Sequence, residues 1–140
     1  MISRYELIES FKDTQGMIRS DETLRNLTLK AQAGTLLYLS GFEAKNPAVK
    51  TQIPVIEVEE DTTFHCAQSY AGGSDKVAVL NFANAYSPGG GVVHGAMAQE
   101  ECLCRSSSLY ASLTIPYIIK NYYKWNSKNT GSLGTDSIIY

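Results

Sequence analysis

The feature that most constrains this chain is a row of three glycines that follows an apolar run. Residues 76–82 are apolar at positions that face both sides of a strand, as is typical of strands in parallel sheets. Gly89, Gly90 and Gly91 follow this run. Consecutive glycines give up backbone order unless another group must approach the main chain closely. The pattern therefore predicts a buried strand with an open loop beyond its carboxyl end.

The order of elements along the chain favours an α/β sandwich with a largely parallel sheet, because helical and extended patterns alternate. We expect helices over residues 2–16, 20–38, 61–71, 98–113 and 117–125, strands over 53–58 and 76–82, and loops over 40–52 and 126–134. In such sheets, ligands bind beyond the carboxyl ends of the strands. The glycine row lies at such an end.

Apolar spacing predicts which side of each helix is buried. Ser20 is the expected N-cap of the second helix and Asp61 that of the third. The expected inward residues are Ile2, Tyr5, Ile8 and Phe11 in the first helix, Leu24, Leu27 and Ala31 in the second, Phe64, Ala67 and Ala71 in the third, and Leu103, Tyr110 and Leu113 in the fourth.

Two adjacent carboxylates, Glu100 and Glu101, begin the helical pattern that follows the glycine row. On a helix they point about 100° apart, so they do not face one another like the paired acids of most glycosidases. They can divide the work, one orienting a ligand and the other delivering a proton. The alternative is that acids in a first helical turn only interact favourably with the helix dipole.

The glycine row matches neither standard nucleotide fingerprint. A P-loop ends in Gly-Lys-Ser/Thr, which is absent here, and the dinucleotide pattern needs glycine where this chain has His94. Three glycines can still form a concave row of amides that receives phosphate oxygens. A tight turn without a ligand, or a phosphate-binding domain for some other nucleotide, remain the alternatives.

The composition of the chain limits the classes of molecule that it can bind. The net charge is −2 and no run of Lys or Arg occurs, which argues against nucleic acid and anionic membranes as partners. The three cysteines, Cys66, Cys102 and Cys104, are odd in number and lack the spacing of zinc ligands, so we expect no metal and a reducing, cytoplasmic setting.

Residues 80–91, followed after seven residues by Gln99-Glu100-Glu101, closely resemble the signature of poly(ADP-ribose) glycohydrolases. The likeness is strongest to the bacterial, macrodomain-type branch, and residues 102–110 and 61–63 share its character. The resemblance implies a macrodomain-like three-layer α/β/α sandwich with a mixed, largely parallel sheet. Residues 1–40 would form a helical N-terminal extension, and residues 53–140 would be part of the catalytic macrodomain.

The resemblance also implies roles for individual residues. Glu101 would be the general acid that protonates the departing ribose oxygen, Glu100 would orient a ribose hydroxyl, and Gln99 would brace the loop. The expected substrate contacts are backbone amides of Gly89, Gly90, Gly91 and Val92, together with Asn84. The implied ligand is ADP-ribose or its polymer, and no cofactor or metal is required. A non-catalytic ADP-ribose-binding macrodomain module is the alternative function.

The apolar residues 136–140 end the chain in a strand-like pattern. Together with the longer extent of the family, this leads us to expect the N-terminal part of a glycohydrolase domain, with weak ADP-ribose binding and little or no hydrolysis by itself. Self-association through an unfinished sheet edge is a further expectation. The alternative is a terminal strand that docks on the same chain.

Overall fold

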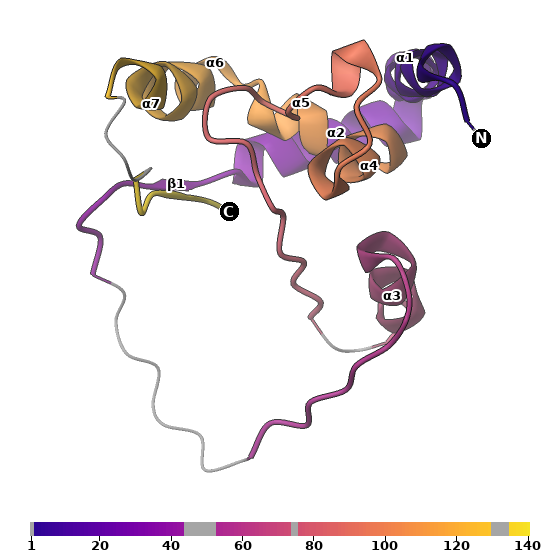
Figure 1. The fold of residues 1–140 in the computed structure, drawn as a ribbon, viewed down its shortest axis with the longest axis horizontal. Coiled ribbons are helices and arrows are strands. Elements are labelled where there is room, and N and C mark those ends of the chain that lie inside the picture. The colour runs from indigo at the N-terminus through magenta and orange to yellow at the C-terminus, as the bar shows by residue number, and fades with distance from the viewer. Residues whose placement is uncertain (1, 44–52, 74–75, 130–134) are drawn as a thin grey trace. The chain divides into compact units, whose positions relative to one another are not determined.

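A computed structural model describes residues 2–43, 53–73, 76–129 and 135–140 of the chain. The structure divides into two compact units, one formed by residues 1–40 and 81–140 and the other by residues 41–80. Figure 1 shows the elements of both units, which are described separately below.

Helix α1 (Arg4–Ser20) begins at a capping box. The Ser3 hydroxyl accepts a hydrogen bond from the Glu6 N–H at 3.2 Å, and the Glu6 carboxylate accepts one from the Ser3 N–H at 2.7 Å. The helix continues past Gly16, where it was expected to end, since a single glycine weakens a helix by only about 1 kcal/mol. Leu7 and Phe11 are its buried residues, whereas Tyr5 is exposed.

Helix α2 (Glu22–Gly34) differs from expectation in three ways. Its N-cap is Asp21 rather than Ser20, because the Asp21 carboxylate accepts the Leu24 N–H at 2.8 Å. Leu24 and Leu27, expected inward, are 41% and 57% exposed, and Thr28 is the buried residue. The helix also ends at Gly34, since the chain then turns into strand β1.

Strands β1 (Leu37–Tyr38) and β2 (Ile138–Ile139) form an antiparallel pair. Leu37 lies opposite Ile139, and hydrogen bonds in both directions between Leu36 and Tyr140 extend the ladder. The apolar residues at 136–140 thus dock on the same chain, which was the alternative reading of that run.

The expected parallel strands do not form within the described residues. Residues 53–58 and 76–82 have no regular secondary structure there, and the described part of the chain offers them no strand partner. Val58 is 94% exposed and Phe82 72% exposed, so the prediction that 76–82 is a buried central strand is wrong for this structure. A strand needs neighbouring strands to pair with its backbone N–H and C=O groups. The local sequence does not show whether such neighbours are present.

The expected fourth helix is interrupted. Helix α4 (Gln99–Ser106) and helix α5 (Leu109–Leu113) are separated at Ser107, whose backbone is extended. The Ser107 hydroxyl donates to the Leu103 carbonyl at 2.8 Å and accepts the Leu109 N–H at 3.2 Å. Such serine bonds compete with the helical ladder, which explains the break.

The expected fifth helix is confirmed but longer and irregular. Helix α6 (Pro116–Ile118) leads into a π-helical turn, η2 (Ile119–Tyr123), and then into helix α7 (Lys124–Lys128). Pro116 occupies the first turn, where a missing N–H costs nothing.

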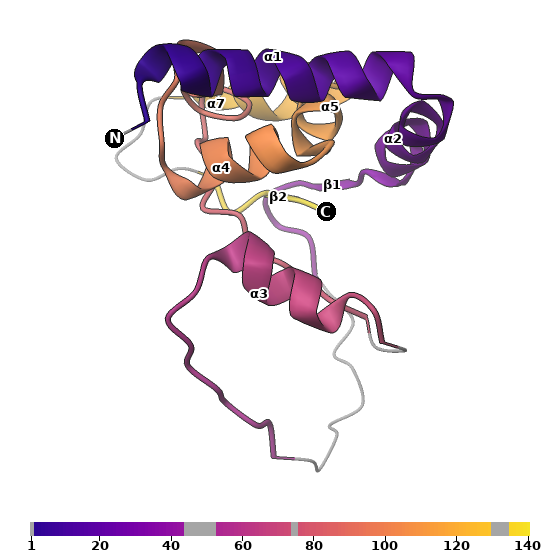
Figure 2. The ribbon, with the colours of Figure 1, turned by 90° about the vertical axis from the view of Figure 1, so that its right-hand side faces the viewer.

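The core of this unit lies beneath the glycine row. Phe11 of α1 packs edge-to-face on Tyr110 of α5, with ring centroids 5.0 Å apart. Figure 2 shows α1 extending along α4, and these helices contact each other and the short 3₁₀ helix η1 (Val92–His94). The buried cluster consists of Phe11, Val92, Cys104, Leu113, Ile118 and Tyr123.

The smaller unit contains helix α3 (Thr63–Tyr70). Thr62, rather than the expected Asp61, caps it by accepting the His65 N–H at 3.2 Å. The helix has no buried residue, so the expected inward face of Phe64, Ala67 and Ala71 does not form a core there. No helix among the described residues is long and apolar enough to cross a membrane.

Candidate active site

The glycine row forms a tight loop between residue 84 and helix α4. Gly89 and Gly90 adopt positive φ angles of 67° and 55°, which other residues rarely adopt. A Cβ atom at Gly89 would lie 2.8 Å from the Tyr110 ring and 3.1 Å from the Cys104 sulfur. At Gly90 it would collide with the Glu101 carboxylate. The glycines are therefore required because the loop packs directly on the core and on Glu101.

The first turn of α4 holds the preceding chain at three successive points. Gln99 Oε1 accepts the Phe82 N–H at 2.7 Å, Glu100 Oε2 accepts the Asn84 N–H at 2.9 Å, and Glu101 Oε1 accepts the Gly91 N–H at 2.8 Å. Acceptors at a helix N-terminus also interact favourably with the helix dipole. The three residues thus brace the loop and fix both acids against it.

Glu100 is 2% exposed and its two carboxylate oxygens both accept hydrogen bonds. Besides the Asn84 N–H, the Asn81 side-chain amide donates to Oε1 at 3.2 Å. Burial raises the pKa of Glu100, against the opposing effect of these hydrogen bonds, and the nearby charge of Glu101 raises it further. Glu100 is thereby held in one orientation.

Glu101 is 7% exposed and differs from Glu100 in how its oxygens are used. Oε1 accepts the Gly91 N–H, while Oε2 is buried without a hydrogen-bond partner among the described residues. A buried carboxylate oxygen of this kind is costly unless a proton or a ligand group completes it. Glu101 therefore has the free position that a proton donor needs.

The predicted ligand-binding amides are used within the chain in this conformation. The Gly90 N–H donates to Ser87, that of Gly91 to Glu101, and that of Val92 to the Gly89 carbonyl. The Val92 side chain is fully buried. In this conformation the loop therefore does not present a row of unused amides. It presents a surface without side chains, which a ligand can approach closely.

The Asn84 side chain, expected to contact a ligand, organises the loop instead. Its Oδ1 accepts the N–H groups of Tyr86 and Ser87 at 2.8 and 2.9 Å. Two further asparagines at the site were not predicted. Asn81 was assigned to an apolar run, and Asn126 to a polar loop that gave no signal of burial.

The structure favours neither the buried cysteine as a nucleophile nor a metal site among the described residues. All three are free thiols, and burial raises the pKa of the Cys104 thiol to about 12. A neutral, buried thiol is a poor nucleophile. No cluster of three metal-ligating side chains occurs in the described parts of the chain.

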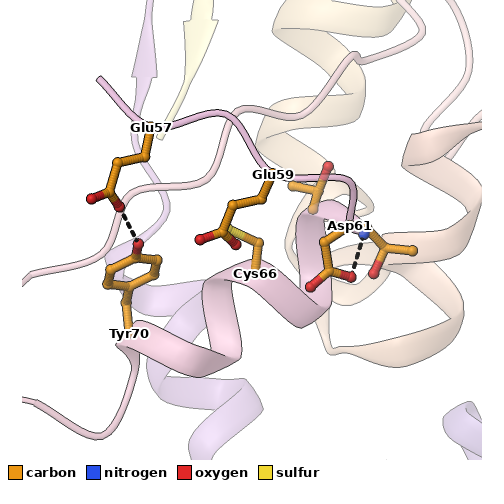
Figure 3. Close-up of a pocket in the computed structure, with 7 residues that line it drawn as sticks. Glu57, Glu59, Asp61, Cys66 and Tyr70 are labelled. Carbon is orange, nitrogen blue, oxygen red and sulfur yellow. Dashed lines mark hydrogen bonds between the residues drawn. The ribbon is translucent and has the colours of Figure 1, made fainter. Parts of the chain in front are cut away.

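The smaller unit contains a shallow acidic hollow of its own (Figure 3). Glu57 accepts a hydrogen bond from the Tyr70 hydroxyl at 3.2 Å, which raises the pKa of that hydroxyl, and Asp61 pairs with His65. The remaining lining residues are Glu59, Thr62, Thr63 and Cys66. Glu57 and Asp61 pair with groups of the same unit, and nothing among the described lining residues indicates a ligand.

Comparisons with known proteins identify the family of this chain. The family model for the microbial-type PARG (poly(ADP-ribose) glycohydrolase) catalytic domain matches residues 7–140. A search of curated proteins returned no match. Among solved structures, poly(ADP-ribose) glycohydrolase from Thermomonospora curvata matches at 31% identity with a TM-score of 0.79, over 97% of this chain and 54% of that chain.

Two further structures of the same enzyme also match. One is bound to the inhibitor ADP-HPD (31% identity, TM-score 0.75, 96% of this chain and 52% of that one). The other carries a single glutamate-to-alanine mutation (30% identity, TM-score 0.75, with the same coverage). The chain thus spans about half the length of these relatives. By the family match over residues 7–140, this chain belongs to the microbial-type poly(ADP-ribose) glycohydrolase catalytic-domain family.

Proposed function

We propose that this chain carries the acid-bearing part of a poly(ADP-ribose) glycohydrolase site, which hydrolyses ribose–ribose O-glycosidic bonds. The observation that carries the proposal is the state of Glu101 beside the glycine row. Its side chain is only 7% exposed, and its Oε2 has no hydrogen-bond partner among the described residues. Membership of the family supports the reaction class. The inhibitor complex of the Thermomonospora curvata enzyme supports a ligand related to ADP-ribose.

In this proposal, Glu101 acts as the general acid. Its protonated Oε2 gives a proton to the departing ribose oxygen as the glycosidic C–O bond breaks, and the sugar passes through an oxocarbenium-like state. Water then adds to the anomeric carbon and returns a proton to Glu101. The Gly91 N–H holds the other oxygen and so aims the acid.

Glu100 and the glycines position the substrate. Glu100, held by N–H donors that include those of Asn81 and Asn84, accepts a ribose hydroxyl at a remaining lone pair, since a carboxylate offers about four acceptor sites. Gly89, Gly90, Gly91 and Val92 allow the diphosphate and distal ribose to approach the backbone, and Asn84 and Gln99 keep the loop in shape. Neither a metal nor a cofactor has a role.

The finer architecture is also a proposal. We infer that residues 53–58 and 76–82 are strands of a macrodomain-like α/β/α sandwich when strand partners are present, because both are rich in apolar side chains that are exposed here. Copies of this chain could pair through these segments, which concentration-dependent sedimentation would reveal. The free thiols support a reducing, cytoplasmic location.

The test compares wild type with Glu101→Gln. We expect calorimetric titration to show the same affinity for ADP-ribose in both, while hydrolysis of poly(ADP-ribose) falls by about 100-fold or more in the variant, since the acid is lost. Glu9→Gln is the matched control, because Glu9 is a surface acid paired with Lys12 on α1. Turnover that survives in Glu101→Gln would refute the assignment of the acid. Binding without turnover in a chain that also carries the second half of the domain would favour a non-catalytic ADP-ribose-binding module.

A further inference from the structure

The helical segment that ends the larger unit has an irregular buried face. Ile118, Tyr123 and Asn126 are its most buried residues, at 1%, 2% and 3% exposed, and they are separated by five and then three positions. A regular helix repeats its inward face every three or four residues. The π-helical turn η2 supplies the extra residue. As a result Asn126 points inward, and its neighbour Trp125 is 49% exposed.

Asn126 is polar but buried, and both ends of its side chain are hydrogen-bonded to other segments. Its Nδ2 donates to the Ala85 carbonyl at 3.0 Å, and its Oδ1 accepts the Thr135 hydroxyl at 3.2 Å. Burying a side-chain amide is costly without such partners. Both bonds are therefore specific features of this packing, and a leucine of similar volume would leave the Ala85 carbonyl without its donor.

The Ala85 carbonyl belongs to the turn that holds Glu100. The preceding residue, Asn84, donates its N–H to Glu100 Oε2 at 2.9 Å. The same residue accepts the N–H groups of Tyr86 and Ser87, which makes residues 84–87 a single tight turn. A movement at Ala85 is thus transmitted directly to the hydrogen bond on Glu100.

We propose that Asn126 is a positioning residue for the acid pair: by holding the Ala85 carbonyl, it fixes the Asn84 N–H against Glu100. The π-helical turn serves this role, because it brings an amide rather than Trp125 to the inward face. The catalytic meaning of this inference rests on the proposed function, whereas its structural content does not depend on turnover.

The experiment compares Asn126→Ala with Thr135→Val. The first variant removes the bond to Ala85, and the second removes only the bond at the other end of the Asn126 side chain. In Asn126→Ala we expect hydrogen exchange of the Asn84 amide to accelerate by about tenfold, the equivalent of one lost hydrogen bond. We also expect carbon-detected NMR titration to show a higher pKa for Glu100, because an N–H donor that stabilises its anion is weakened.

Turnover supplies a separate readout. Displacing a positioned group costs up to about 100-fold in rate. We therefore expect kcat on poly(ADP-ribose) to fall by about 10- to 100-fold in Asn126→Ala, with a smaller change in KM. Thr135→Val should keep wild-type exchange at Asn84, the wild-type titration of Glu100 and the wild-type kcat.

The outcomes test the positioning role of Asn126 separately from the proposed function. Unchanged Asn84 exchange and Glu100 titration in Asn126→Ala would overturn the positioning role, as would equal changes in Thr135→Val. If Asn126→Ala does not fold, Asn126→Ser keeps a small polar group that is too short to hold Ala85, and the same readouts apply. Turnover concerns the proposed function alone, whereas exchange and titration decide the role of Asn126 without it.

Discussion

At the scale of single residues, Gly90 shows how the backbone of the loop and the acid depend on one another. Its φ of 55° disfavours any side chain, and a Cβ there would meet the Glu101 carboxylate. We expect Gly90→Ala to lower the free energy of unfolding by about 1–3 kcal/mol, through backbone strain. It should also abolish turnover, because Glu101 is displaced. Urea denaturation and an activity assay measure the two effects.

The matched control for Gly90→Ala is Gly16→Ala. Gly16 lies within α1 and has open space where a Cβ would stand. This substitution should raise the free energy of unfolding by about 0.5–1 kcal/mol, since alanine is the better helix former. A Gly90→Ala variant as stable and active as wild type would contradict the contact between the loop and Glu101.

The residues of the acid pair could be identified from sequence, but their bonding could not. Glu100 and Glu101 follow the glycine row at a spacing that brings a first helical turn back to the loop. Which N–H groups they accept depends on the path of the loop, which no local pattern encodes. The same applies to Asn126, because its burial depends on one π-helical turn.

At the scale of elements, α1 depends on its capping box and in turn supports the site. Phe11 of α1 belongs to the core, and the Thr14 hydroxyl donates to the Arg105 carbonyl of α4. We expect Ser3→Ala to lower the free energy of unfolding by about 1 kcal/mol, because the Glu6 N–H loses its acceptor. Ser10→Ala, on the exposed part of the same helix, should leave stability equal or slightly higher. Equal losses in both variants would show that the cap does not contribute.

Helix positions were predicted better than strands, for a physical reason. Capping groups and apolar spacing are local, so α1, α3, α4 and the 116–128 segment were located from sequence, with errors at their ends and at the Ser107 break. A strand is completed by partners elsewhere in the chain. Residues 53–58 and 76–82 have strand-like composition, but the described residues do not pair with them.

At the scale of the whole molecule, Glu100 makes the stability of the fold depend on pH. Its pKa is raised in the folded state, mainly by burial, so between its unfolded and folded pKa values the folded protein binds more protons. Stability should therefore fall as pH rises from the ordinary range of glutamate through the raised pKa. The pKa values of Asp61 and Glu6 are lowered instead, by hydrogen bonds from His65 and Ser3 respectively, and these groups act in the opposite direction.

A comparison of wild type with Glu100→Gln isolates the Glu100 contribution. The variant changes the contacts with Asn81 and Asn84, which shifts stability by an amount that does not depend on pH. The difference in free energy of unfolding, variant minus wild type, should nevertheless grow as pH rises from about 4 toward neutrality, because only wild type has to ionise a buried carboxyl. Urea denaturation at a series of pH values measures this difference. A difference that stays constant over that range would mean that Glu100 titrates alike in the folded and unfolded chain, and that burial does not raise its pKa.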